Sequence, residues 1–218
     1  LIEIDKGIYR PGGIKNAYIK DCTINDNVYI SDIKCLHNYT IEQNVIIDNV
    51  DRLVVESETS FANGIEITVL NEGGGREVPL FDQLTAQIAY IMTTYRHDQQ
   101  LIKDLHKIIL NYSETKRSKT GLIEENASIK DCGQIRNVKI GAFAQISGAI
   151  ELSEGTIKSN QYAPTIIGSG VIARSFIVLS GSTVDSAALL EKTFVGQGVQ
   201  VGRQFSAENS LIFANSEC

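Results

Sequence analysis

One pattern of apolar residues returns every 17 residues along much of the chain, and this repeat restricts the fold more than any other feature. Ile30 and Ile47 occupy equivalent positions in residues 24–33 and 41–50, and their apolar neighbours also correspond. After a long interruption the pattern returns at residues 140–146, 167–173 and 195–201. A fixed period of this kind is typical of solenoids, in which each repeat is one structural unit that stacks on the next.

The residues within one repeat predict how it folds. Each copy starts with an aliphatic residue, and a small residue follows four positions later, as at Ile140 and Ala144. We expect the aliphatic side chain to point inward and to stack on its equivalents in adjacent coils. Gly and Asn occur where the backbone must turn, because a positive φ costs these residues least. Three such sides make one triangular coil, which gains its stability by stacking because a single coil cannot offset its own ordering entropy.

These motifs resemble those of the hexapeptide-repeat family. The resemblance rests on I-G-x-G-V at residues 167–171 and on I-x-x-N-V-x-I at residues 24–30 and 41–47. The family includes acyltransferases and the carboxy-terminal domains of sugar-nucleotide pyrophosphorylases. The resemblance implies an all-β fold, here with a helical insertion: a single-stranded left-handed parallel β-helix of hexapeptide repeats. It also implies a homotrimer. Left-handedness comes from the resemblance alone and is an exception to the usual right-handed crossover.

A second resemblance covers nearly the whole chain. It rests on four segments, Asn63–Glu66, Val69–Glu72, Gly74–Val78 and Tyr95–His97. They are similar to segments of larger, uncharacterised bacterial proteins that are described as related to UDP-N-acetylglucosamine pyrophosphorylase. It transfers no catalytic residue. Because residue 1 is Leu rather than Met and the last residues still follow the repeat, we expect the chain to be a fragment of a longer protein.

Between residues 71 and 120 the repeat is absent and two helices are predicted. Apolar residues spaced by 4, 3 and 4 positions define one face of each helix: Leu84, Ile88, Ile91 and Tyr95, then Leu101, Leu105, Ile108 and Tyr112. Asp98 is the expected N-cap of the second helix. We therefore divide one continuous domain into first coils (1–70), a helical hairpin insertion (71–120) and second coils (121–218). The apolar face of the hairpin needs cover from the coils or from another subunit, and the trimer resemblance favours the subunit.

Charge and composition exclude several classes of function. The formal net charge is −6, which argues against a nucleic-acid partner because phosphate binding needs a clustered positive face. Lys116–Lys119 is the nearest approach to a basic run, and we interpret it as a solvated loop. No apolar stretch reaches the roughly 20 residues of a membrane span, so we expect no membrane partner. The four cysteines form no C-x-x-C pair, which predicts reduced thiols in a cytoplasmic protein.

A glycine-rich segment is the first candidate binding site. Asn71, Glu72 and Arg76 flank three consecutive glycines, whose N–H groups could converge on an anion while the arginine holds a phosphate or carboxylate. The alternative is a flexible hinge in which Arg76 pairs with a neighbouring glutamate, since glycine clusters mark loops more often than sites. Arg96, in the predicted break between the helices, is a further candidate for substrate binding.

Histidine is the usual general base of hexapeptide acyltransferases, so each histidine is a candidate. His97 follows Arg96 in the break between the helices, and His37 falls in a predicted loop over residues 34–40 that would project from a coil. His106 is the expected surface or packing residue on the second helix. We expect His97 and Arg76 to lie at opposite ends of the hairpin, so that only an intersubunit site could join them. For each histidine alone, a structural role is the alternative.

Two functions follow as hypotheses. The first is a hexapeptide-type acyltransferase that acts on a sugar or nucleotide sugar, with His97 or His37 as base. It would use acyl-CoA as a co-substrate and no tightly bound cofactor. The second is a non-catalytic trimerising or regulatory module of a larger pyrophosphorylase-related protein. No metal site is predicted, because no His, Cys or Asp pair has zinc-ligand spacing.

Overall fold

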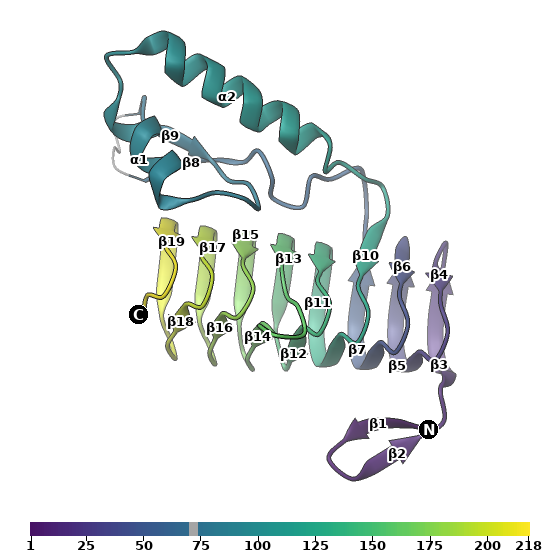
Figure 1. Cartoon of the computed structure of the whole chain (residues 1–218). Helices are drawn as coiled ribbons and strands as arrows, with labels where there is room; N and C mark the ends of the chain where they lie inside the picture. The colour runs from purple at the N-terminus through teal and green to yellow at the C-terminus, as the bar shows by residue number, and fades with distance from the viewer. Residues whose placement is uncertain (70–73) are drawn as a thin grey trace.

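The computed structural model describes residues 1–69 and 74–218. Within these residues the chain is mostly β-structure with two helices, and 15 strands form one large, curled parallel sheet (Figure 1). The curled sheet contains β3 (Gly13–Lys20), β4 (Thr23–Ile24), β5 (Tyr29–His37), β6 (Tyr39–Ile41), β7 (Ile46–Val54), β10 (Gly121–Ile123), β11 (Ser128–Ile140), β12 (Gln145–Ser147), β13 (Glu151–Ile157), β14 (Ile166–Ile167), β15 (Ile172–Val178), β16 (Thr183–Val184), β17 (Leu189–Val195), β18 (Gln200–Val201) and β19 (Ser206–Ile212). Two antiparallel pairs, β1 (Ile2–Asp5) with β2 (Ile8–Arg10) and β8 (Glu66–Thr68) with β9 (Glu77–Pro79), and the helices α1 (Ala86–Thr94) and α2 (Gln99–Glu114) complete the fold.

The curled sheet pairs residues one repeat apart, as the sequence pattern predicts. Ile30 pairs with Ile47 in parallel register, and both side chains are completely buried. The prediction that these residues share one interior is therefore confirmed. Ile47 pairs in turn with Ile129, so the register continues across the insertion. The full row of buried partners is Ile30, Ile47, Ile129, Ile146, Ile167, Val184 and Val201.

The backbone turns at corners where one residue has a positive φ. One row of corners contains Asn27, Asn44 and Asn126, with φ of 57°, 59° and 59°. Asparagine visits this region more readily than most residues with a β-carbon, and Asn27 Nδ2 donates to Asn44 Oδ1 at 2.7 Å. The next corner of this row is Phe143, with φ of 60°. A positive φ is unusual for so bulky a residue. Phe143 therefore departs from the asparagines that occupy the preceding corners of this row.

Two aromatic rings inside the curled sheet lie over glycines in the next coil. A β-carbon on Gly155 would come within 2.3 Å of the Phe176 ring, and Gly121 lies equally close to the Tyr39 ring. The Tyr39 hydroxyl donates to the Val138 carbonyl at 2.8 Å, which satisfies its only buried polar group. These glycines therefore make room for the largest side chains of the interior.

The insertion lies along one side of the curled sheet and packs on it (Figure 1). Both predicted helices are present, and the Asp98 carboxylate caps α2 as predicted by accepting the Leu101 N–H at 3.0 Å. Apolar side chains of the insertion form one cluster with Ile177 and Phe194 of the sheet. The curled sheet of the same chain thus covers the buried face of the helical hairpin. The resemblance to trimeric proteins favours cover by another subunit instead.

The buried faces of the two helices differ from the predicted ones. In α2, Ile108 is 64% exposed and Ile109 is buried; beside α1, Tyr95 is exposed and Met92 is buried. Residues 108–110 are all apolar, so spacing alone cannot distinguish neighbouring stripes of the helix surface. Packing against the sheet determines which side of each helix is buried.

Candidate functional site

Two adjoining cavities separate the insertion from the curled sheet, and both are lined by Asp82, Lys139 and Thr156. Their volumes are about 350 and 160 Å³. Segments that are far apart in the sequence meet here. They are the turn after β7, the loop after β9, the segment that follows α2, and the strands β10, β11 and β13. We call this place the Asp82 cleft.

Asp82 is the centre of the cleft and is only 7% exposed. The Tyr112 hydroxyl donates to Asp82 Oδ1 at 2.5 Å. Lys158 Nζ lies 3.1 Å and Lys116 Nζ 3.6 Å from Asp82 Oδ2. The Asp82 backbone N–H donates to Asn63 Oδ1 at 2.9 Å. Through its carboxylate and its backbone N–H, Asp82 therefore ties together α2, the segment after α2, the loop after β7 and the sheet.

The electrostatic surroundings keep Asp82 ionised. Burial raises the pKa of this carboxyl, but the hydrogen bond from Tyr112 and the charges of Lys158 and Lys116 outweigh it, so the pKa lies below its ordinary value. A buried carboxylate is tolerated because it is paired and hydrogen-bonded. Asp82 is therefore a fixed negative charge and not a proton donor near neutral pH.

Positive side chains outnumber negative ones around the cleft. The four cationic residues that line it are Lys116, Arg117, Lys139 and Lys158, and the two carboxylates are Asp82 and Glu124. Lys139 Nζ lies 3.6 Å from Glu124 Oε1, and its side chain is 38% exposed. Arg117 Nε lies 2.8 Å from Oε2 of Glu114, which is outside the cavity lining, so four cations face three carboxylates in all. A chain with a formal net charge of −6 thus concentrates positive charge at this one concave place, where an anion would gain most from it.

Tyr112 does not supply a general base. Burial and its hydrogen bond to Asp82 raise the pKa of the Tyr112 hydroxyl above its ordinary value, and Lys116 Nζ lies 4.7 Å from the ring centroid. The hydroxyl therefore stays protonated and acts as a donor. The arrangement is suited to holding an anion and is poorly suited to removing a proton.

The structure brings the glycine segment and the break between the helices together. The Arg96 guanidinium lies 3.4 Å from the position that a β-carbon on Gly75 would take. The expectation that the glycine segment lies at the far end of the hairpin from His97 is therefore wrong. The physical reason is that β8 and β9 pair with each other, so that Gly75, just before β9, lies beside Arg96 in the break between the helices. Asn71 and Glu72 lie outside the described residues.

Few features of this tip indicate a site. The Gly75 N–H donates to Glu77 Oε1 at 2.6 Å, which lowers the pKa of that carboxyl. The N–H group proposed to receive a ligand thus already has a carboxylate partner. Arg76, Arg96 and His97 are all exposed. The His97 ring lies 5.8 Å from the Tyr95 ring, measured between centroids.

His37 belongs to a strand and not to a projecting loop. It ends β5, and it pairs in register with Lys20 and Val54 of the neighbouring strands. The loop prediction is wrong because Leu36 and Tyr39 are fully buried, so this segment forms two regular sides of a coil. His37 Nε2 lies 3.1 Å from Asp21 Oδ2 at the surface. His106, on α2, lies 3.8 Å from Glu66 Oε1 through Nδ1.

Sequence reasoning missed the Asp82 cleft because its residues come from separate segments. Lys116 belongs to the run that we interpreted as a solvated loop, and the structure corrects this by pairing it with Asp82. One signal was available. Asp82 directly follows the apolar run Val78–Phe81, and a carboxylate that ends a buried run needs a partner.

Three further observations concern the described residues as a whole. In residues 1–69 and 74–218, no group of three or more His, Cys, Asp or Glu side chains is arranged to hold a metal ion. No helix in the same residues is long and apolar enough to cross a membrane. The four cysteines are all free thiols.

Comparison with known proteins gives a family and one relative. The chain is 29% identical over 172 residues to an "Uncharacterized protein" of Treponema pallidum (strain Nichols). The match covers 74% of this chain and only 24% of that protein, so the chain spans about a quarter of its relative. A family model described as "Domain of unknown function (DUF4954)" matches residues 1–218. Because this match covers the whole chain, the protein belongs to the DUF4954 family.

Proposed function

We propose that the chain is a non-catalytic ligand-binding module of a larger protein, and that it holds a phosphorylated sugar or nucleotide sugar in the Asp82 cleft. The observation that carries this proposal is the excess of positive side chains around a concave place in an acidic chain. We further propose that the curled sheet is a left-handed parallel β-helix of hexapeptide type. Its 17-residue register and its positive-φ corners support this, as does the resemblance to the hexapeptide-repeat and pyrophosphorylase-related proteins.

The cleft suits a phosphate for three reasons. Its larger cavity of about 350 Å³ is within the range of roughly 300–1,000 Å³ typical of small-molecule sites. Ammonium groups bind phosphate as point charges. Asp82 holds Lys116 and Lys158 in place, so the cations are pre-organised before a ligand arrives.

The acyltransferase hypothesis remains a prediction that rests on family resemblance. Acyl transfer from acyl-CoA needs a base, and none of the three histidines lines the Asp82 cleft. Release of free thiol from acetyl-CoA in the presence of nucleotide sugars would support this alternative. The homotrimer likewise remains a prediction, which sedimentation equilibrium would test. The four free thiols support the cytoplasmic location that we propose.

Calorimetric titration with UDP-N-acetylglucosamine and with N-acetylglucosamine 1-phosphate tests the binding proposal. We expect at least one to bind, with an affinity that falls as salt rises because the contact is between charges. Lys139→Ala should weaken binding by roughly tenfold to 150-fold, since a hydrogen bond to a charged group contributes about 1.5–3 kcal/mol. Lys139 is the chosen position because Lys116 and Lys158 also hold the insertion through Asp82.

Lys103→Ala is the matched control, because Lys103 is an exposed lysine of α2 that does not line the cleft. It should bind like the unchanged chain. If neither ligand binds, or if Lys103→Ala and Lys139→Ala weaken binding equally, the Asp82 cleft is not the phosphate site.

A further inference from the structure

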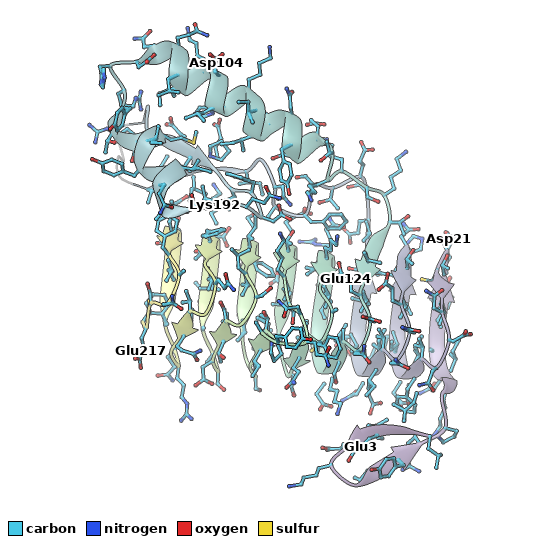
Figure 2. The ribbon with its side chains drawn as sticks, in the orientation of Figure 1. Glu3, Asp21, Asp104, Glu124, Lys192 and Glu217 are labelled. Carbon is cyan, nitrogen blue, oxygen red and sulfur yellow. The ribbon has the colours of Figure 1, made fainter. Side chains whose placement is uncertain are left out.

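A second cavity, of about 700 Å³, lies under the N-terminal hairpin β1–β2. Its floor is formed by β11 and β12, and its walls are the hairpin on one side and the loop with Gln161 and Pro164 on the other. We call it the hairpin groove. Figure 2 shows Glu3 of the hairpin and Asp104 of α2 at opposite sides of the curled sheet, so the groove is remote from the insertion.

Neutral hydrogen-bonding side chains predominate on the floor of the groove. They are Asn126, Ser128, Gln145 and Ser147, and Gln161 adds another amide from the wall. Ser128 and Gln145 are register partners on neighbouring strands, and Gln145 is exposed. Amides and hydroxyls each both donate and accept. A row of such groups matches the hydroxyls of a sugar, which also donate and accept.

Phe143 adds an aromatic ring to this polar groove at a conformational cost. It lines the cavity and occupies the corner that Asn27, Asn44 and Asn126 occupy in earlier coils, with φ of 60°. A residue with a β-carbon pays roughly 1–2 kcal/mol for the left-handed region, and Asn would reduce this cost. The Phe143 ring therefore lies at a corner whose backbone conformation is unfavourable for phenylalanine. A flat apolar face beside hydrogen-bonding groups is complementary to the C–H face of a pyranose ring.

The charges of the groove do not favour an anion. Its cationic side chains are Lys6 and Lys130, and its carboxylates are Glu3, Asp5 and Asp131. Lys130 Nζ already donates to the Ile4 carbonyl of the hairpin. In contrast to the Asp82 cleft, this place has no surplus of positive charge to bind phosphate.

We infer that the hairpin groove binds a neutral oligosaccharide, with the Phe143 ring stacked on one sugar and with Gln145 and Ser128 hydrogen-bonded to its hydroxyls. This site is separate from the Asp82 cleft and does not depend on the function proposed for it. The cavity is large enough for more than one sugar ring, since drug-sized ligands occupy about 300–1,000 Å³.

Saturation-transfer NMR on the whole chain tests this inference, with maltotriose, cellotriose and chitotriose as probes at millimolar concentration. We expect saturation transfer to at least one of the three. Phe143→Asn should weaken its binding by roughly fivefold to tenfold, the effect of losing about 1–1.4 kcal/mol of stacking. The same substitution should leave the thermal midpoint unchanged or raise it, because Asn suits this corner. A merely structural Phe143 would give the opposite result, a lowered midpoint with unchanged binding.

Gln145→Ala and Gln200→Ala form a matched pair for the floor of the groove. Register partners link Gln145 through Ile166 and Thr183 to Gln200, so both glutamines occupy the same position on different coils. Both are exposed, and only Gln145 lines the groove. Gln145→Ala should weaken sugar binding and Gln200→Ala should not. Absence of saturation transfer to all three sugars, or equal binding by all variants, would overturn the inference.

Discussion

The curled sheet and the insertion are stabilised in different ways. In the sheet, rows of aliphatic side chains repeat the same arrangement from coil to coil, and Ile129, for example, pairs in register with Ile47 on one side and Ile146 on the other. The insertion has a smaller apolar cluster and one buried carboxylate, Asp82, that connects it to the sheet. Repeated contacts distribute stability along a solenoid, whereas the insertion docks on one side of the sheet through one apolar cluster and the contacts of Asp82, so it can open locally. The insertion should therefore unfold before the sheet.

The largest expected effect comes from the interior of the sheet. Ile129→Ala should lower the free energy of unfolding by about 2–5 kcal/mol, because it leaves a cavity in a fully buried row. Met92→Ala, in the cluster of the insertion, removes a side chain of similar size but should lower the stability of the insertion alone. Urea denaturation followed by circular dichroism measures the first effect.

Thiol labelling of the same two variants distinguishes opening of the sheet from opening of the insertion. Burial raises the pKa of the Cys132 thiol to about 11, so this residue of β11 reacts only when the sheet opens. Ile129→Ala should speed Cys132 labelling, and Met92→Ala should leave it unchanged. Equal acceleration by both would mean that sheet and insertion form one cooperative unit.

The second-largest expected effect concerns the contacts of Asp82 that attach the insertion to the sheet. Asp82→Asn keeps an acceptor for the Tyr112 hydroxyl but removes the charge that pairs with Lys116 and Lys158. Because these two lysines are partly exposed, we expect a loss of about 1–2 kcal/mol, confined to the insertion. Hydrogen exchange of the α2 amides at neutral pH should accelerate by roughly fivefold to thirtyfold, with little change in the amides of β15 and β17.

The pH dependence follows from the lowered pKa of Asp82. A carboxyl whose pKa is lower in the folded chain contributes stability above its unfolded value, about 3.9. This contribution is lost as the pH falls through the lower folded value. Protection of α2 should therefore fall in acid more steeply in the unchanged chain than in Asp82→Asn. Parallel acid profiles for the two proteins would contradict the role given to Asp82.

The contrast between the regions also explains what could be predicted from the sequence. The register of Ile30 with Ile47 was predictable because each inward position recurs at a fixed interval. The Asp82 cleft was not predictable, since Asp82, Lys116 and Lys158 come from three segments without a common period. The contact of Gly75 with Arg96 was not predicted because it depends on the pairing of two short strands, β8 and β9. A strand of three residues leaves almost no periodic signal.

The smallest expected effect lies within the insertion, at the start of α2. Asp98→Ala removes the hydrogen bond to the Leu101 N–H and should destabilise the helix by about 1 kcal/mol, the usual value of an N-cap. Hydrogen exchange in the first turns of α2 should accelerate roughly fivefold, while Cys132 labelling stays constant. Asp104→Ala is the control, since Asp104 is an exposed residue of the same helix (Figure 2). If Asp98→Ala also accelerated Cys132 labelling, opening of α2 would be coupled to opening of the sheet, and the two regions could not be independent units.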